Sequence, residues 1–549
     1  MVSAHEYLTC DAGVVAVLSK LVGGPVRPYG GSVIRTVEVL AALSLTTDLA
    51  SGVAFEKGLR TCVLAVSFAG RLGSSDEERS TVFHAALLRS IGCTAHAPEN
   101  AAVFVDDTAF QAALKRLDPG DPSVFAAQLA HFGEWVPGRQ RELAATFGRI
   151  AGTVGPYAAR SGCEVSRALG GGLGMSAAVL DALDDVYERW DGLGIPAGRR
   201  GDELSYPARI VHVAEQAVFA HAEAGGAGGV VVDVVSGVST EVSRRAGGHL
   251  DPDLAAAFVR HTDELLAALA VPDLLTAVVA AEPGPGARVD TNGLERLCRG
   301  LAVVADLKGT HLVGHSPHVA VVADSAAATA GMANRERGTL RAAALLHDLG
   351  RTVVPSSVWD RAGPLDAADQ ERVRLHSYWT ERVLRRCPGL DSLAETAAGH
   401  HERCDGSGYH RGVRSGDLPW AARLLAGADV FAACREPRPY RPAMTLDAAR
   451  RVLASEVTAG RLDVDAAAAV IDGAGLAPLP RAWPSGLTDR EVDVLRHTAR
   501  GLSNRAIAAE LGVSERTVGH HLAHVYDKTG RRTRAGAAVF AVEHGLLPQ

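Results

Sequence analysis

The spacing of apolar residues is the feature that most constrains the fold of this chain. From Ser32 onward, Ala, Leu and Val recur three and four residues apart, and the alternation of apolar and polar residues that is typical of strands is rare. This spacing places apolar side chains along one face of a helix, where they can pack against neighbouring helices. The sequence therefore predicts a mainly α-helical protein.

The length and the net charge of the chain indicate how many domains and what kind of DNA contact to expect. With 549 residues, of which 47% are hydrophobic, the chain has enough apolar material for several domains. The formal net charge of -7 argues against a basic surface over the whole protein. Any contact with DNA must therefore be local.

The cysteines and the N-terminal sequence indicate in which cellular compartment the protein is expected. The eight cysteines are scattered without a CxxC pair, which indicates reduced thiols in the cytoplasm rather than a disulfide framework or a zinc knuckle. The N-terminus lacks a basic region followed by an apolar run, and Pro272 and Asp273 interrupt the apolar stretch of residues 265–281. We therefore expect neither a signal peptide nor a membrane span.

The chain contains an internal repeat. Residues 187–215 align without a gap on residues 401–429, at an offset of 214, with eleven of the twenty-nine positions identical. At a second offset of 258, residues 87–92 fall on residues 345–350, and Lys57 falls on His315. We interpret the two copies as two units of one fold, at residues 31–290 and 291–472, preceded by a short N-terminal segment of residues 1–30.

Residues 400–412, HHERCDGSGYHRG, combine metal-ligand residue types with a turn. Adjacent imidazoles cannot share one face of a helix, so His400 and His401 can act together only where a helix ends and the chain bends. The run Asp405-Gly406-Ser407-Gly408 predicts that bend, because Asp-Gly is a strong turn signal and glycine tolerates positive φ.

Further histidines and aspartates lie in or beside apolar helical patterns on both sides of this stretch. Burying such groups is costly unless they are paired or bind metal. Five histidines and two aspartates exceed the needs of one tetrahedral ion, so the sequence predicts a centre of two divalent ions, which can clamp a phosphoryl group. Imidazole and carboxylate ligands suit Fe, Mn, Zn or Ni. The expected ligands are His315, His347, Asp348, His376, His400, His401 and Asp429.

Residues 306 to about 445 resemble an HD-GYP domain, a helical metal-dependent phosphodiesterase that typically hydrolyses cyclic di-GMP. The resemblance rests on the order of these ligands and on the later stretch RPYR, residues 438–441. Seven ligands suit two ions that share a carboxylate, and we expect Asp348 to be that bridge. With Arg351 expected to steady developing charge, these two are the predicted catalytic residues. The resemblance also implies that substrate phosphate meets the side chains of Arg438, Tyr440 and Arg441.

The second unit departs from the family pattern at two positions. Arg351 stands where the family usually has a lysine, in HDxGK, and His410 stands in place of the proline of GYP. Arginine keeps the charge but changes the geometry and the proton chemistry. These two positions therefore bear on substrate preference and on turnover.

The first copy of the repeat keeps the spacing of the aligned segments but lacks the metal ligands. Lys57 replaces His315, Arg89 and Ser90 replace the HD pair, and Glu215 replaces Asp429. Val186 and Tyr187 fall on the double histidine, and Cys163 stands where we expect the counterpart of His376. One carboxylate and one thiol cannot hold two ions. We interpret residues 31–290 as a degenerate HD-like domain that senses a ligand or packs on its sister.

The C-terminal segment, residues 487–549, has a different character and follows a linker at residues 473–486. Thr488 with Glu491 predicts a capping box that starts one helix, and Ser503 predicts the cap of a second. A tight turn at residues 512–514 leads to a third helix, residues 515–528. The segment contains nine Lys and Arg against seven Asp and Glu, so it is mildly basic.

On the third helix, Val518, Leu522 and Val525 recur at core spacing, and a polar stripe faces the other way. The segment resembles a LuxR-type helix-turn-helix domain of four helices. This resemblance implies that the third helix enters the major groove of double-stranded DNA. Phosphate contacts are then expected from Arg505, Arg516 and Lys528, and contacts to base edges from Thr517, His520, Ala523 and His524.

Three hypotheses of function follow. In the first, the protein is a DNA-binding regulator whose HD-GYP unit hydrolyses a cyclic dinucleotide, with cyclic di-GMP favoured. In the second, which Arg351 and His410 favour, the metal site senses a nucleotide without turning it over. In the third, the helical units serve only as a dimerisation scaffold, since helix-turn-helix proteins usually bind paired half-sites as homodimers.

Overall fold

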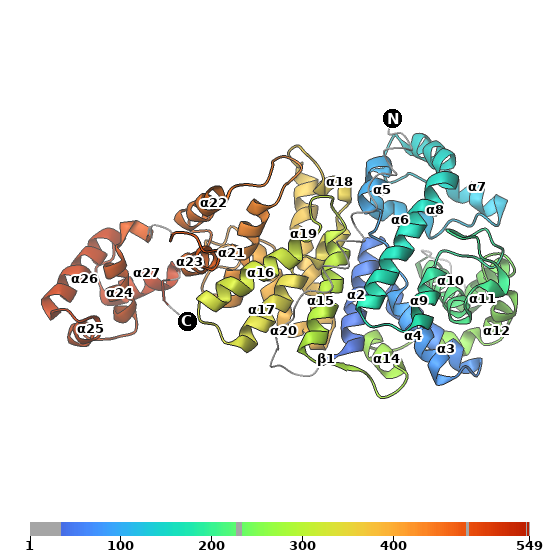
Figure 1. Cartoon of the computed structure of the whole chain (residues 1–549), viewed down its shortest axis with the longest axis horizontal. Helices are drawn as coiled ribbons and strands as arrows, with labels where there is room; N and C mark the ends of the chain where they lie inside the picture. The colour runs from blue at the N-terminus through green and yellow to red at the C-terminus, as the bar shows by residue number, and fades with distance from the viewer. Residues whose placement is uncertain (1–33, 227–232, 479–482, 545, 548–549) are drawn as a thin grey trace. The chain divides into compact units, whose positions relative to one another are not determined.

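The computed structural model describes residues 34–226, 233–478, 483–544 and 546–547. The expected N-terminal segment, residues 1–30, and part of the expected linker lie outside these ranges. The described chain is mainly helical, as predicted (Figure 1). Its only sheet within these ranges is an antiparallel pair of two-residue strands, β1 (Ile34–Arg35) and β2 (Arg288–Val289), in which Ile34 pairs with Val289.

The chain divides into two compact units, and each draws on separate stretches of sequence. Unit 1 comprises residues up to 314 together with 348–392, and unit 2 comprises residues 315–347 together with 393–549. The region that we expect to form the second domain, residues 291–472, therefore contributes to both units. Its expected boundaries stay a prediction.

Unit 1 is built around α2, an apolar helix with thirteen of its fifteen residues buried. Such a helix needs neighbours on every side, and α2 packs against α3, α4, α14 and α15. The helices of unit 1 are α2 (Thr36–Ala50), α3 (Lys57–Arg71), α4 (Asp76–Leu88), α5 (Ala97–Phe104), α6 (Asp107–Leu114), α7 (Pro122–Ala130), α8 (Gln140–Gly172), α9 (Ala177–Asp184), η2 (Gly201–Glu203), α10 (Tyr206–Gly226), α11 (Val234–Arg245), α12 (Pro252–Val259), α13 (Thr262–Ala267), α14 (Leu274–Ala281), α15 (Thr291–Asp306), η3 (Leu349–Val353), α18 (Ser356–Trp359), α19 (Ala367–Arg386) and η4 (Pro388–Leu390).

Unit 2 is organised around α16, which packs against α17, α21 and α23. Helix α20 (Asp391–Ala398) begins at the end of unit 1 and continues into unit 2. The other helices of unit 2 are α16 (His315–Thr329), α17 (Asn334–Leu346), η5 (Gly399–His401), α21 (Trp420–Arg435), α22 (Leu446–Thr458), α23 (Val464–Gly473), η6 (Pro484–Gly486), α24 (Asp489–Ala499), α25 (Asn504–Leu511), α26 (Glu515–Thr529) and α27 (Arg534–Glu543).

The bounds of several helices repeat at the offsets found in the sequence. Adding 258 to the bounds of α3 and α4 gives the bounds of α16 and α17, and adding 214 to those of α9 gives those of α20. Helix α10 likewise begins 214 residues before α21. The element bounds thus support the internal repeat, and its interpretation as two HD-type units stays a prediction.

The turns that follow α9 and η5 are built alike. The buried carboxylate of Glu188 accepts hydrogen bonds from two backbone amides, those of residues 197 and 199, at 2.8 and 3.0 Å. The carboxylate of Glu402 accepts from residues 411 and 413, 214 positions later, at 2.8 and 3.1 Å. A Cβ on Gly194 or Gly408 would lie 2.4 Å from backbone atoms, so both positions require glycine. In each unit this turn connects two helices.

The C-terminal helices α24 to α27 confirm the four helices expected for residues 487–549. Thr488 and Glu491 form the predicted capping box, and Ser503 caps α25. Gly512 ends α25 with φ +65°, a backbone conformation that favours glycine. None of the described helices combines the length and the apolar character that a membrane crossing requires.

Candidate functional site

Unit 2 contains five of the seven expected metal ligands. His315 is the first residue of α16, and His347 directly follows α17. His400 and His401 lie in η5, where a helix gives way to the turn predicted for residues 405–408. Asp429 lies on α21 and is buried, as are His315, His347 and His400.

Backbone carbonyls orient two of these imidazole rings. His347 donates from Nδ1 to the carbonyl of Ala344 at 2.6 Å, and His400 donates to that of Ala397 at 2.7 Å. A carbonyl can only accept, so each Nδ1 carries the proton and each Nε2 carries the lone pair. Such a hydrogen bond is the usual support of a histidine that binds metal.

Asp429 lies between two of the histidines. Its Oδ1 atom is 3.2 Å from Nε2 of His315 and 3.9 Å from Nε2 of His347, and the ligand atoms of the three residues lie within 4.8 Å of one another. Burial opposes ionisation of the Asp429 carboxyl. The hydrogen bond from His315 and the charges of His401 and His347 nevertheless hold its pKa well below the usual range. A carboxylate and two imidazoles at this spacing fit a divalent transition metal.

Glu436 supports this group, although the sequence did not point to it. Its Oε2 atom lies 2.8 Å from Nδ1 of His315, and its Oε1 atom lies 2.8 Å from Nδ1 of His318. Burial would raise the pKa of Glu436, but the hydrogen bonds from these histidines lower it to about 2. A carboxylate behind a histidine is a common support of a metal ligand. Spacing gave no signal for it, because His315 lies 121 residues away.

Unit 1 contains the other two expected ligands. The Oδ1 atom of Asp348 lies 3.3 Å from Nε2 of His376, whose Nδ1 interacts with the carbonyl of Val373. The Oδ2 atom of Asp348 lies 2.7 Å from Nη2 of Arg351, and all three charged or titratable side chains are buried. Trp359 covers the guanidinium, with 5.4 Å between Cζ and the ring centroid. Since His347 and Asp348 are consecutive, one peptide bond joins the two ligand sets.

The RPYR stretch differs in the exposure of its members. Tyr440 is 67% exposed, whereas Arg438 is mostly buried and pairs with Glu436 at 3.0 Å. Arg441 donates to carbonyls at the end of α21, including those of Ala433 at 2.6 Å and Glu436 at 3.1 Å. It therefore satisfies helix carbonyls. The expected contact of Arg438, Tyr440 and Arg441 with substrate stays a prediction.

Helix α26 has the two faces that the sequence predicts. Val518, Leu522 and Val525 are buried in the core of the C-terminal helices. Of the expected DNA contacts on this helix, Thr517 is half-buried, and the others are exposed: Arg516, His520, Ala523, His524 and Lys528. Arg505 is also exposed and lies on α25. The Ser514 side chain caps α26 by accepting from the Thr517 amide at 3.1 Å. An exposed helix end of this kind suits contact with phosphate and base edges.

Glu491 restrains two of these residues, which the sequence did not reveal. Lys528 lies 2.7 Å from Oε2 of Glu491 and also donates to the carbonyl of Gly486 at 3.0 Å. Nδ1 of His524 lies 3.5 Å from Oε1 of the same carboxylate. Lys528 thus already has protein partners at the position where a phosphate contact is expected.

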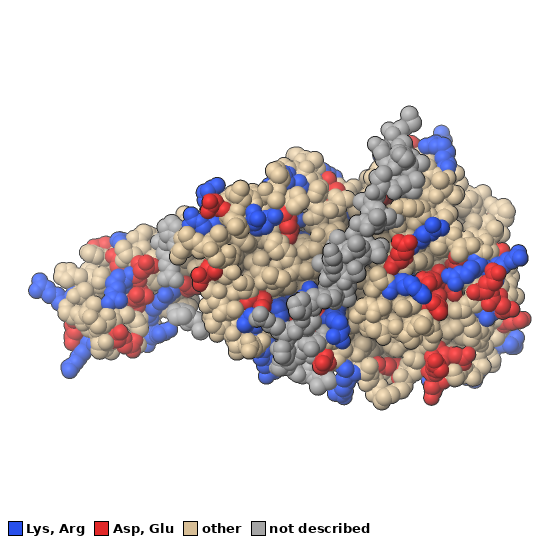
Figure 2. All heavy atoms as spheres, in the orientation of Figure 1, with Lys and Arg blue, Asp and Glu red and all other residues tan. Residues whose placement is uncertain are grey.

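The charges around α24 to α27 are mixed. On the face shown in Figure 2, Lys and Arg lie beside Asp and Glu in this part of the chain, without one broad basic patch. This agrees with the small excess of nine basic over seven acidic residues in residues 487–549. Any contact with DNA would therefore depend on individual side chains rather than on the summed charge.

Two family models match the chain in the regions just described. Residues 301–466 match the HD domain, and residues 485–541 match the luxR family of bacterial regulatory proteins. The chain therefore contains an HD domain followed by a LuxR-type helix-turn-helix domain.

Among relatives, the 3'3'-cGAMP-specific phosphodiesterase 3 of Vibrio cholerae serotype O1 is 28% identical over 433 residues, which cover 76% of this chain and 90% of that protein. A cyclic di-GMP phosphodiesterase of Thermotoga maritima is 34% identical, over 26% of this chain and 39% of that protein. The transcriptional regulatory protein YdfI of Bacillus subtilis is 48% identical over 61 residues, which are 11% of this chain and 29% of that protein.

A solved structure shares the fold. The crystal structure of a cyclic GMP-AMP specific phosphodiesterase of V. cholerae, V-cGAP3, superposes with a TM-score of 0.56 and 23% sequence identity. The match covers 81% of this chain and 99% of that chain. The likeness therefore extends through most of the helical region, beyond the HD domain itself.

Proposed function

We propose that this protein is a DNA-binding transcriptional regulator whose HD domain is a metal-dependent phosphodiesterase acting on a cyclic dinucleotide. The observation that carries the proposal is the set of buried histidines with Nδ1 fixed by protein oxygens, next to buried Asp429. Burying this many polar rings is costly without a metal to bind them. The LuxR-type domain supplies the contact with DNA.

In this proposal the seven ligands expected from the sequence hold two divalent ions. His315, His347, His400, His401 and Asp429 come from unit 2, and Asp348 and His376 come from unit 1. The peptide bond between His347 and Asp348 keeps the sets adjacent in the chain, and Asp348 would be the carboxylate that both ions share. Divalent ions bound there would supply Lewis acidity at phosphorus and a nucleophile at neutral pH. Fe, Mn, Zn and Ni all suit these ligands.

The side chains of this chain have separate tasks in the reaction. The carbonyls behind His347 and His400 hold the proton on Nδ1, which leaves the Nε2 lone pair of each ring for a metal ion. Arg351 orients Asp348 through their ion pair and offsets negative charge that develops on the phosphate. Glu436 fixes the orientation of His315. The proposed phosphate contacts of Arg438, Tyr440 and Arg441 complete the substrate site.

The relatives support the proposed substrate class. The relative that spans most of this chain is specific for 3'3'-cGAMP, whereas relatives that match only the HD domain include cyclic di-GMP phosphodiesterases. We therefore propose a cyclic dinucleotide and place 3'3'-cGAMP beside cyclic di-GMP as substrates to test. Binding of this second messenger in the cytoplasm would then regulate attachment of the LuxR-type domain to paired half-sites, as a homodimer.

A second candidate is a sensor that binds the nucleotide without hydrolysing it. The observation that favours it is the 2.7 Å ion pair between Arg351 and Asp348, because a guanidinium on the bridging carboxylate competes with the ions for its charge. In this case the occupied site would control DNA binding through its bound state alone.

One set of measurements separates these functions. Purified full-length protein is loaded with Mn²⁺ or Fe²⁺, analysed for metal, incubated with 3'3'-cGAMP or cyclic di-GMP, and followed by chromatography. The phosphodiesterase gives a linear product that is lost in His400→Ala and His401→Ala, while the exposed His131→Ala control keeps activity. Binding without product supports the sensor. A protein that takes up no metal overturns both.

A further inference from the structure

Unit 1 contains a cavity that no part of the proposed phosphodiesterase uses. It has a volume of about 200 Å³ and lies among residues of α5, α6 and α8. Phe104 and Phe110 stack with ring centroids 4.1 Å apart, and Phe147 meets both edge-on at 6.4 and 6.3 Å. Leu114, Ile150 and Val154 also line it. The apolar wall is therefore rigid and shaped by aromatic rings.

Polar side chains close one part of this cavity. Cys93 and Tyr187 line it, and the charges of Lys115 and Arg89 act on these two side chains. Burial raises the pKa of the Cys93 thiol, against the opposing charge of Lys115. Burial likewise raises the pKa of the Tyr187 hydroxyl, against the charge of Arg89. The lining thus combines an apolar wall with a thiol and a phenol on which the charges of Lys115 and Arg89 act.

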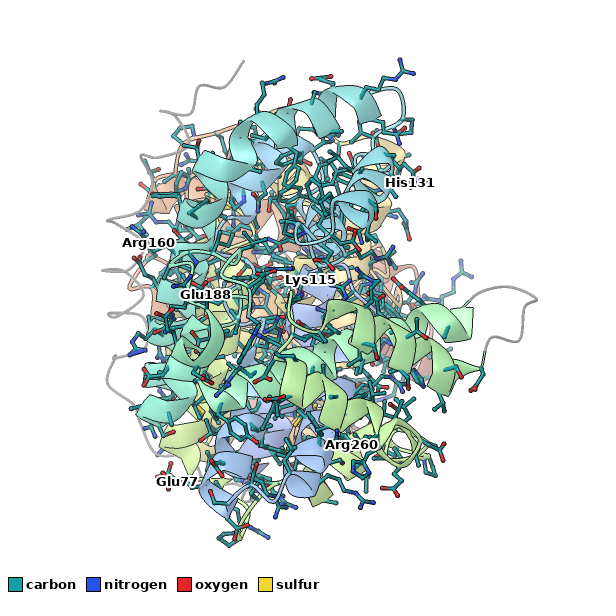
Figure 3. The ribbon with its side chains drawn as sticks, turned by 90° about the vertical axis from the view of Figure 1, so that its right-hand side faces the viewer. Glu77, Lys115, His131, Arg160, Glu188 and Arg260 are labelled. Carbon is teal, nitrogen blue, oxygen red and sulfur yellow. The ribbon has the colours of Figure 1, made fainter. Side chains whose placement is uncertain are left out.

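We call the charged groups behind this region the cation cluster: Lys57, Arg89 and Lys115 with Glu215 and Asp48. Lys57 and Arg89 both form ion pairs with Glu215, deep in unit 1. Lys115 lies 3.2 Å from the hydroxyl of Ser90, and Gln111 and Leu114, just before it in α6, line the cavity. In the view of Figure 3, Lys115 lies near the middle, whereas His131 and Glu77 lie at the margin.

The cation cluster carries more positive than negative charge. Glu215 is ionised, because Arg89 and Lys57 hold its pKa well below the usual range even though burial opposes them. Burial raises the pKa of Asp48 to about 7, so this carboxyl is only partly ionised at neutral pH. Burial and Lys57 lower the pKa of Lys115 to about 8, so its ammonium is mostly charged. The cluster therefore has three basic side chains against two carboxyl groups.

A buried excess of charge is costly unless a partner neutralises it. An anionic group at the cavity would supply that partner, and an apolar ring would fill the space that the phenylalanines line. The volume is below the range of about 300–1,000 Å³ that holds drug-sized ligands, so the ligand must be small. A phosphate is held by several strong donors at once, whereas Lys115 and the Tyr187 hydroxyl suit a carboxylate.

We propose that this cavity binds a small aromatic carboxylic acid, with one or two rings against the wall formed by Phe104, Phe110 and Phe147 and the carboxylate toward Lys115. Arg89 and Ser90 align with the HD pair of the second unit, and Lys57 aligns with His315. At two of these aligned positions the first unit thus has basic side chains, whereas the second unit has proposed metal ligands. The first unit would then sense an organic acid, a role that does not depend on phosphodiesterase activity.

The test is isothermal titration calorimetry of the full-length protein with 2-naphthoate, and with uncharged 2-naphthalenemethanol for comparison. We expect saturable one-to-one binding of 2-naphthoate and affinity at least about tenfold weaker for the alcohol. Lys115→Met should weaken 2-naphthoate binding by a similar factor, and Lys115→Arg should retain it. Ala158→Phe fills the cavity and should abolish binding. Arg149→Gln removes an exposed cation from the same region of α8 and should change nothing.

Several outcomes would overturn the proposal. They are no saturable binding at millimolar 2-naphthoate, equal affinity for the alcohol, and a Lys115→Met variant that behaves like Arg149→Gln. The melting temperature of each variant is measured first. If Ala158→Phe does not fold, the pair Lys115→Met and Lys115→Arg decides, because methionine keeps most of the side-chain volume and arginine keeps the charge.

Discussion

Arg351 and Asp348 form a buried ion pair, with 2.7 Å between Nη2 and Oδ2, three residues apart at the start of η3. The carboxylate that we propose as the metal bridge is therefore already neutralised in part by its own chain. Removing one partner of a buried ion pair leaves the other charge uncompensated, which costs about 3–5 kcal/mol. The pair thus connects stability to metal binding.

We expect Arg351→Met to destabilise the metal-free protein by about 3 kcal/mol. Added Mn²⁺ should restore most of this loss, because the ions neutralise Asp348 in place of the guanidinium. Thermal unfolding with and without Mn²⁺ measures both effects. An equal loss of stability in the two conditions would contradict the role of Asp348 as a metal ligand.

The contact between Glu436 and His315 leads to a second prediction. Glu436→Gln should weaken metal affinity by about 10–100-fold, the usual effect of losing a carboxylate behind a ligand histidine. Calorimetric titration with Mn²⁺ measures the change. His318→Ala removes the other histidine on Glu436 without removing a proposed ligand, so a larger effect from His318→Ala would argue against our assignment.

The C-terminal domain allows a comparison of two basic residues on α26. Lys528 is bound by Glu491 and by the carbonyl of Gly486, whereas Arg516 is exposed at the start of the helix. Each phosphate contact contributes about 0.9 to the slope of log affinity against log salt concentration. Arg516→Met should therefore reduce this slope by about one, and Lys528→Met should reduce it less.

Fluorescence anisotropy with a labelled duplex at several salt concentrations gives both slopes. Lys528→Met should also lower the melting temperature of the domain, since the buried carboxylate of Glu491 loses its ion pair. A full reduction of the slope in Lys528→Met, with unchanged melting, would mean that Lys528 leaves Glu491 and contacts phosphate when DNA binds.

The first unit should be sensitive to acid through His212. Burial, assisted by the charge of Arg89, lowers the pKa of this histidine to about 3, against a normal value of 6.5. Between these pH values the unfolded chain binds a proton that the folded chain does not, so stability falls as the pH falls from 6.5 toward 3. His212→Gln should flatten this dependence. Unfolding by urea at several pH values tests it, and parallel curves for both proteins would contradict it.

Local patterns were sufficient for much of the architecture. Helical spacing predicted a mainly α-helical chain, and Thr488, Ser503 and Gly512 marked helix ends in the C-terminal domain. These features depend on hydrogen bonds and dihedral angles within a few residues. The internal offsets of 214 and 258 likewise anticipated the matching helix bounds. The order of the histidines and aspartates was sufficient to indicate a resemblance to HD-GYP domains and to suggest which residues bind metal.

The sequence by itself thus determined the secondary structure, the repeat and the identity of the metal-ligand candidates. Each depends either on residues close together in the chain or on the order of residue types that is typical of a family. Tertiary structure alone decided which distant side chains meet: Glu436 with His315, Glu491 with Lys528, and Glu215 with Lys57 and Arg89. Such contacts follow from how helices pack, and packing depends on the shapes of many side chains at once. No spacing rule along the chain encodes them.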